Sequence, residues 1–225
     1  MNSEHLSALL ITIKLAFATT LILLVLAIPI AWWLAWSDSK WKPIIESLVS
    51  LPLVLPPTVL GFYFLIAFSK NSFIGKWLEQ SFGISLVFSF SGLLLGSVIY
   101  SFPFVVRPLQ NTFTAIGRRP MEFASICGAS PRDAFFSVLL PLATPGIISA
   151  SILGFAHTLG EFGVVLMIGG SLPGETKVLS ISIFELVEIG HFEQAHYLSA
   201  FLLGLCFIML LSVHLLQNKT RGGWF

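Results

Sequence analysis

The chain has 225 residues, of which 56% are apolar, 10% are charged and 21 are phenylalanine. Ordinary soluble domains carry roughly 25% charged residues, and one of this size could not bury so much apolar surface in a single core. Because lipid removes that difficulty, the composition favours an integral membrane protein. The net charge of +1 argues against binding to nucleic acid, and two cysteines indicate neither a disulfide framework nor a metal site.

Five stretches are apolar and long enough to cross a bilayer, which takes about 20 helical residues. A further apolar stretch, Val178–Phe184, is too short to cross, so we interpret it and its surroundings, residues 178–190, as an external or re-entrant segment. We predict an all-α integral membrane protein, a single domain over residues 1–225 with five transmembrane helices. The expected spans are about 12–36, 47–69, 85–106, 142–169 and 197–218.

The first stretch lies where a signal peptide would lie, but its apolar part is too long for one. Trp32, Trp33 and Trp36 stand where small cleavage-site residues would be needed, and they fit an interfacial belt instead. With the N-terminus outside, eight of the twelve Lys and Arg residues fall on the inner side. Since these residues are enriched in cytoplasmic loops, we predict that the N-terminus is outside and the C-terminus inside.

Prolines interrupt the second stretch. Pro56 and Pro57 remove backbone donors and free carbonyl groups near the middle of the expected span, and Thr58 and Gly61 follow. This arrangement suits a gate or the lining of a translocation path. A structural kink packed against neighbouring helices is the alternative.

The inner loop from Arg107 to Pro141 is long for a connection between spans and has its own helical pattern. Gly128 can end a first short helix with a positive φ. Ser130 with Asp133 can cap a second one, which we expect to stop before Pro141. A helix, a glycine turn and another helix suit a knob inserted into a partner's cleft or an amphipathic hairpin on the membrane surface, and the spacing leaves both open.

Part of this loop resembles a family signature. Glu122-Phe123-Ala124, then Gly128, then Leu140-Pro141 is similar to the EAA motif of bacterial ABC-importer permeases, with Phe123 in place of the usual Ala. The resemblance implies the type I ABC importer (MetI-like) permease fold. Residues of about 119–139 would then be the coupling helices that dock into a groove on an ATP-binding subunit. The docking residues it implies are Glu122, Ala124, Gly128, Ala129, Pro131, Arg132 and Asp133.

Three further segments, residues 51–61, 158–163 and 173–177, resemble the molybdate permeases among these importers. The resemblance implies a multi-pass protein of the bacterial inner membrane that translocates molybdate, with a sulfate, thiosulfate or tungstate permease as the alternative. It also implies the partners: a second copy of the chain, two ATP-binding subunits, an external periplasmic molybdate-binding protein and the lipid bilayer.

The sequence contains no Walker A pattern, GxxxxGK followed by Ser or Thr. We therefore expect no catalytic residue, cofactor or metal in this chain, and we expect the partner subunit to use ATP-Mg. A carrier or channel driven by an ion gradient would call for inverted repeats or a relay of ionisable residues, and neither is evident. A membrane-embedded enzyme would have only His157 and Glu161 as an acid–base pair.

An oxyanion cannot dissolve in hydrocarbon, so a polar path must open between helices. The residues that we assign to this path or its gate are Pro56, Pro57, Thr58, Gly61 and Glu161. An ionised Glu161 would repel an oxyanion, and His157 lies four residues earlier on the same helical face. We therefore interpret these two mainly as a structural or gate-stabilising pair.

Arg107 ends the expected third span on the inner side. It could draw an anion out of the path there, although the role of interfacial anchor suits the charge bias better. The outer loop, residues 171–196, is acidic. It fits a docking surface for a basic patch on the binding protein and a solvated surface equally well. Its acidic residues are Glu175, Glu185, Glu188 and Glu193.

Overall fold

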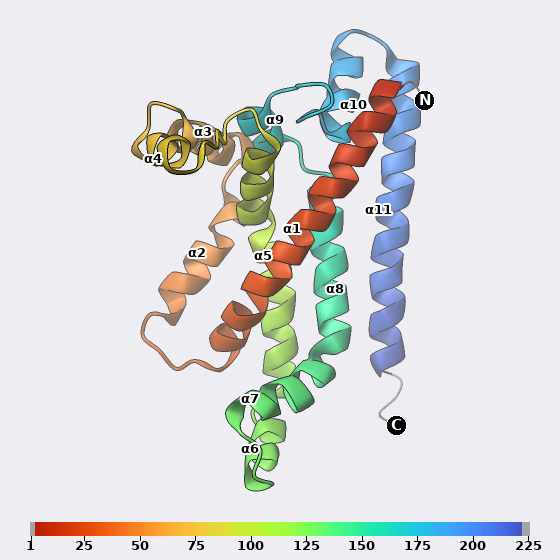
Figure 1. The fold of residues 1–225 in the computed structure, drawn as a ribbon. Helices are drawn as coiled ribbons and strands as arrows, with labels where there is room; N and C mark the ends of the chain where they lie inside the picture. Colours follow the sequence, from red (N-terminus) through yellow and green to blue (C-terminus); the bar gives the residue numbers. More distant parts are fainter. Residues whose placement is uncertain (1–2, 222–225) are drawn as a thin grey trace.

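The computed structural model describes residues 3–221, so residues 1–2 and 222–225 of the expected domain lie outside it. The described residues form helices and turns without a strand, which confirms the all-α prediction (Figure 1). In chain order, the elements are α1 (Ser3–Trp36), α2 (Lys42–Val54), α3 (Pro57–Phe68), α4 (Phe73–Phe82), α5 (Phe90–Ile116), α6 (Arg119–Ile126), α7 (Pro131–Ala134), the π-helical turn η1 (Phe135–Leu139), α8 (Leu140–Leu159), α9 (Gly163–Gly169), α10 (Leu179–Glu188) and α11 (Phe192–Arg221).

Four uninterrupted helical runs within the described residues are long and apolar enough to cross a membrane. The fifth expected span is present as a bent pair, α2 and α3, whose axes differ by 109°. The number of spans agrees with the prediction when the bent pair counts as one. The four uninterrupted runs are Glu4–Trp36, Phe90–Ile116, Pro131–Leu159 and Phe192–Leu215.

The centre of the bundle is formed by α1, α5 and α8, and α11 stands at its outer side (Figure 1). Leu23 of α1 and Val105 of α5 are fully buried there. Gly154 of α8 makes this packing possible, because a Cβ at that position would lie 2.5 Å from Cγ2 of Val105. Small residues at helix contacts let membrane helices approach closely and gain dispersion energy.

The bend between α2 and α3 follows from the two consecutive prolines. A residue that precedes proline is driven out of the helical region, and here this applies to both Leu55 and Pro56. Both are extended, with ψ of 136° and 134°, and Pro57 then starts α3 at a position that needs no backbone donor. The expected span 47–69 is therefore two helices.

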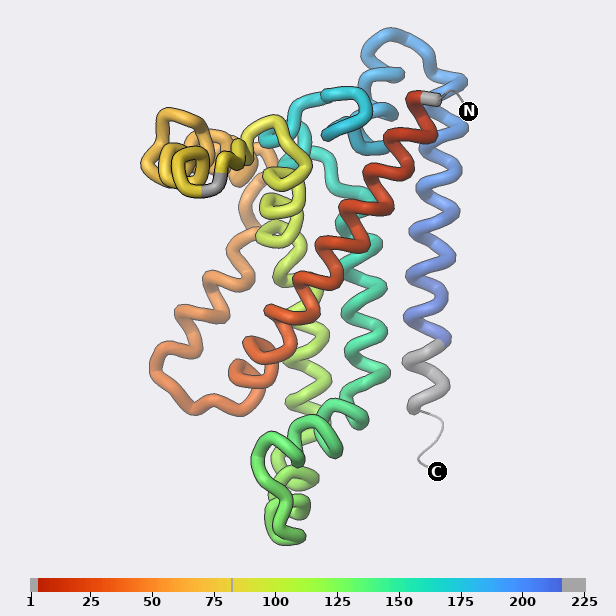
Figure 2. The backbone as a smooth tube through the Cα atoms, viewed as in Figure 1, coloured from red at the N-terminus to blue at the C-terminus, as the bar shows by residue number. Residues whose placement is uncertain are grey.

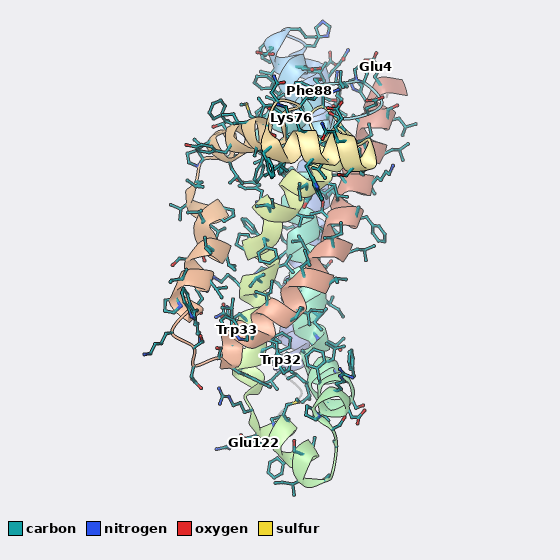
Figure 3. All side chains as sticks on the ribbon, turned by 60° about the vertical axis from the view of Figure 1, so that its left-hand side comes forward. Glu4, Trp32, Trp33, Lys76, Phe88 and Glu122 are labelled. Atoms are coloured by element: carbon teal, nitrogen blue, oxygen red, sulfur yellow. The ribbon has the colours of Figure 1, made fainter. Side chains whose placement is uncertain are left out.

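A helix that the sequence reading did not include, α4, follows α3 and lies across the long helices, with Lys76 on it (Figure 3). The Ser72 side chain accepts a hydrogen bond from the Gly75 backbone N–H at 2.9 Å, and Gly83 ends the helix with φ of 65°. These are ordinary start and stop signals that the search for long apolar runs overlooked.

Helix α5, which corresponds to the third expected span, continues well past the expected end at residue 106. Pro103 and Pro108 lie within it, and it ends only at Gly117, which has φ of 71°. Arg107 is consequently inside the helix and not at its end.

The fourth expected span, 142–169, is shifted and divided. Helix α7, η1 and α8 form one run from Pro131 to Leu159, so the second short helix of the inner loop does not stop before Pro141. In a straight α-helix the ring of Pro141 would clash with a carbonyl one turn earlier. The wider π turn directly before it, in which the Leu140 N–H bonds the Phe135 carbonyl, lets the run pass this proline.

The outer segment after α9 is a packed helix. Helix α10 has Leu179 and Ile181 buried and lies against α1 and α11. The Leu179 N–H donates to Thr12 Oγ1 of α1 at 2.8 Å, which fixes the start of α10. Helix α11 then begins at Phe192, earlier than the expected residue 197.

Candidate functional site

Residues 119–139, which we call the elbow, project beyond the rest of the bundle at the end away from residue 3 (Figures 1 and 2). Helix α6 ends in a Schellman motif, in which the Ala129 N–H donates to the Ala124 carbonyl and the Gly128 N–H to the Ser125 carbonyl, both at 3.0 Å. Gly128 has φ of 88°, which glycine adopts without a Cβ penalty. The structure thus contains the expected glycine turn.

The second helix of the elbow is capped as predicted. Ser130 Oγ accepts a hydrogen bond from the Asp133 N–H at 3.2 Å and donates one to Asp133 Oδ2 at 2.5 Å. Pro131 occupies the first helical position, where its missing N–H costs nothing. Hydrogen bonds within the elbow therefore account for its bends.

The tip of the elbow is exposed. None of the residues of α6 is buried, and Phe123 and Ile126 are 67% and 81% exposed. Glu122 lies on the same projecting helix (Figure 3) and is exposed, as are Arg132 and Asp133. Large apolar side chains beside charged ones suit a protein surface that binds a partner.

Aromatic contacts join the elbow to the base of α1. The ring of Trp32 lies 4.8 Å from that of Phe135 in η1, and Trp36 Nε1 donates to the Phe113 carbonyl of α5 at 3.1 Å. Trp33, at the end of α1 (labelled in Figure 3), is exposed, so of the three tryptophans it best fits the expected belt. The sequence reading missed this contact because it joins distant parts of the chain.

Two helix breaks meet in the part of the bundle that lies away from the elbow (Figure 1). Residues 55–57 separate α2 from α3, residues 160–162 separate α8 from α9, and we call the pair the double break. A Cβ on Gly163 would lie 2.7 Å from Cβ of Pro57, and one on Gly61 would lie 2.7 Å from Cβ of Met167. Gly61 and Pro57 therefore pack α3 against α9, whereas Pro56 and Thr58 are exposed.

Glu161 lies within the double break and is 3% exposed. Its backbone carbonyl accepts a hydrogen bond from Ser180 Oγ at 2.6 Å, but neither carboxylate oxygen has a hydrogen-bond partner among the described residues. The expected pair with His157 is not formed, because the helix ends at Leu159 and the two residues no longer share a helical face.

His157 packs on α5 instead. Its ring stacks on Phe104 with 3.7 Å between centroids, and its Nδ1 is 2.9 Å from Ser101 Oγ. Tyr100, Phe104 and Arg107 are partly exposed and recur at helical spacing, so they share one face of α5. We call this face, with the stacked His157, the α5 stripe.

The outer loop is more ordered than a solvated surface requires. Lys177 Nζ lies 2.5 Å from Glu185 Oε2, and Ser171 donates a hydrogen bond to the same carboxylate. Partial burial raises the pKa of Glu185, but the hydrogen bonds from Lys177 and Ser171 and the charge of Lys177 outweigh it, so the pKa is lowered overall. Glu175, Glu188 and Glu193 remain exposed.

A helical bundle with a broken span and a projecting helix–glycine–helix elbow has the fold of a type I ABC importer permease. The solved structure of a bacterial ABC transporter that imports the acidic polysaccharide alginate aligns with a TM-score of 0.75 over all of this chain and 82% of that one, at 16% identity. The inward-facing MetNI methionine ABC transporter aligns with a TM-score of 0.71 over 97% of this chain and 99% of that one, at 17% identity. At these identities the likeness concerns the fold.

The chain belongs to the binding-protein-dependent transport system inner membrane component family, whose model matches residues 27–221. The molybdenum transport system permease protein of Azotobacter vinelandii is 52% identical, with 98% of both chains covered. That of Haemophilus influenzae is 38% identical over 96% of this chain and 95% of the relative. The expectation of a multi-pass transport permease of the inner membrane is thereby confirmed.

Proposed function

We propose that this chain is the permease subunit of an ABC importer that carries molybdate across the bacterial inner membrane. The support comes from relatives that are named as molybdenum transport permeases and resemble this chain over nearly its whole length. A sulfate transport permease of Escherichia coli is 29% identical over 97% of this chain, so the related tetrahedral oxyanions remain the alternative cargo.

One observation carries the mechanical part of the proposal. The second helix of the elbow, from Pro131, continues without interruption through η1 and α8 up to the double break. A partner that displaces the elbow therefore moves the far end of α8, where Glu161 and Gly163 contact other elements. By this route an ATP-binding subunit can open and close a path in a chain that shows no nucleotide motif of its own.

The elbow residues have distinct roles in this proposal. Glu122, Arg132 and Asp133 present charges to the ATP-binding subunit, while Gly128 sets the angle between the two elbow helices. Ala124, Ala129 and Pro131 shape the backbone of the turn. ATP-Mg is bound and hydrolysed by that subunit.

We place the path on the two-fold axis of a dimer of this chain. One bundle of five spans is too small to enclose a path, and two copies related by a two-fold axis can enclose one between them. The α5 stripe and the exposed Pro56 and Thr58 line it, and the double break forms its gate, with Gly61 and Glu161 in its packed core. The partners are then two ATP-binding subunits and a periplasmic molybdate-binding protein, which meets the outer loop. The N-terminus faces the periplasm and the C-terminus the cytoplasm.

The test is ATP-dependent molybdate uptake by the chain expressed with its ATP-binding subunit and binding protein. Gly128→Pro forces φ to about −65° where 88° is observed, so we expect intact insertion but loss of both co-purification and uptake. Gly128→Asn is the matched control, since Asn tolerates the left-handed region and should retain most uptake. Uptake that persists without any ATP-binding subunit would contradict the proposal, and sulfate taken up in preference to molybdate would reassign the cargo.

A further inference from the structure

Arg107 is held by hydrogen bonds to a neighbouring helix. It lies inside α5, which continues to Ile116, and its side chain reaches sideways to α2. An anchor would extend its charge past the end of the helix into water. Charged residues inside membrane helices are costly, and they characteristically mark ion pathways.

The guanidinium of Arg107 is surrounded by neutral oxygens. Nη1 donates to Gln110 Oε1 at 3.0 Å, Nη2 to the Glu46 carbonyl at 3.2 Å, and Nε to Ser50 Oγ at 3.1 Å. The ion pairs in the described part of the chain involve other residues. The Glu46 carboxylate instead accepts a hydrogen bond from Gln110 Nε2 at 2.7 Å, so it is linked to Arg107 only through that amide.

Ser50 lies at the edge of the guanidinium that recognises anions. The Nε–Nη2 edge matches two oxygens of a planar or tetrahedral oxyanion. Here both nitrogens donate to the same atom, Ser50 Oγ. A neutral hydroxyl therefore stands where an oxygen of an anion would bind, and an anion would form the stronger, charge-assisted bonds.

We infer that Arg107, with Gln110 beside it, is a transient binding site for a tetrahedral oxyanion in the inner half of the path, and that Ser50 closes this site when it is empty. The inference rests on the proposed function and names a substrate contact for it. Ser50 and Glu46 belong to α2, whereas Arg107 belongs to α5, so movement of α2 away from α5 exposes the guanidinium. A gated contact of this kind suits a conduit, because an ion held permanently would leave slowly.

The test uses the complete importer in proteoliposomes, with molybdate uptake and ATP hydrolysis measured together. Arg107→Gln should lower uptake about tenfold or more while hydrolysis stimulated by the loaded binding protein stays near the wild-type rate. Arg107→Lys should restore part of the uptake, since lysine returns the positive charge but not the planar arrangement of N–H donors. Ser47→Ala is the matched control and should leave uptake near wild type, because this exposed hydroxyl of α2 donates to the Pro43 carbonyl of its own helix.

If Arg107 served only to join α5 to α2, Ser50→Ala would weaken the same joint. Uptake and hydrolysis would then fall together in Ser50→Ala and Arg107→Gln, and that result would overturn the inference. A wild-type importer that takes up no molybdate would contradict the proposed function instead.

A second measurement is independent of transport. Ser50→Cys is placed in a chain whose Cys127 and Cys206 are replaced by Ala, and its modification by a negatively charged thiol reagent is timed. Millimolar tungstate should slow the modification when Arg107 is present and leave it unchanged in Arg107→Gln. Equal rates with and without tungstate in the chain that keeps Arg107 would also overturn the inference.

Discussion

The elbow and the double break both interrupt helices, but they are held in different ways. The elbow is shaped by hydrogen bonds between neighbours in sequence, those of Gly128 and Ser130, and none of the residues of α6 is buried. The double break is shaped by contacts between distant segments, such as Gly163 against Pro57. The elbow is thus held by its own hydrogen bonds while it presents a free face, whereas the shape of the double break depends on where the helices packed around it lie.

The largest expected effect falls on the double break. Gly61→Ala places a Cβ 2.7 Å from Cβ of Met167 and 3.2 Å from Cα of Val164, which are not free to move aside, so we expect a loss of about 1–3 kcal/mol in stability. The measurement is the thermal unfolding midpoint of the purified chain in detergent. Gly204→Ala is the control, since a Cβ there meets nothing within 4 Å. Equal midpoints for the two variants would show that the double break is not held by this packing.

The second effect lies where the elbow meets the bundle. Phe135→Leu removes a ring that packs 4.8 Å from Trp32, at a cost of roughly 1–1.5 kcal/mol, and should lower molybdate uptake per ATP hydrolysed. Phe136→Leu changes the neighbouring ring, which is 65% exposed, and should change little. Uptake per ATP that falls equally in both variants would argue against a specific link through Trp32.

A smaller effect tests whether the elbow is locally determined. Ser130→Ala removes the cap on α7, which typically costs about 1 kcal/mol. Hydrogen exchange should become faster in the Pro131–Leu139 region and stay unchanged at α3 and α9. Faster exchange at α9 as well would show that the two regions are not separate.

The smallest effect concerns the ion pair between Glu185 and Lys177 in the outer loop. The pKa of Glu185 is lowered in the folded chain, so its interactions stabilise the outer loop above the pKa of the unfolded chain, and this stability is lost as the pH falls toward the folded pKa. We expect hydrogen exchange of residues 172–186 to be slower in the wild type than in Glu185→Gln at neutral pH and equal in both at acid pH. A difference that grew on acidification would contradict the assignment.

Much of the elbow could be predicted because its determinants are local. A Ser–Pro pair with an acidic residue at the third helical position, and a glycine after a short helix, encode their own geometry. The prolines likewise predicted an interruption at residues 56–57, but not its angle, which depends on what α3 packs against.

Other features could not be predicted from sequence patterns. Gly160 and Gly163 are local signs that α8 ends at Leu159, but the apolar stretch that follows them suggested one long span. The contact of Gly163 with Pro57, at the break that separates Glu161 from His157, has no local sign. The network of Arg107 joins residues of two separate helices, and a charge near an expected span end looks the same whether it is an anchor or a ligand. In each case the deciding contact is long-range.

The run Pro131–Leu159 has a consequence for how such chains can vary in length. It contains 29 residues, and each residue of an α-helix adds 1.5 Å and about 100° of rotation. Inserting or deleting a single residue would therefore turn one end by more than a quarter revolution relative to the other. The length of this run therefore fixes the rotation of the elbow relative to the double break, so we expect insertions and deletions to be excluded from it.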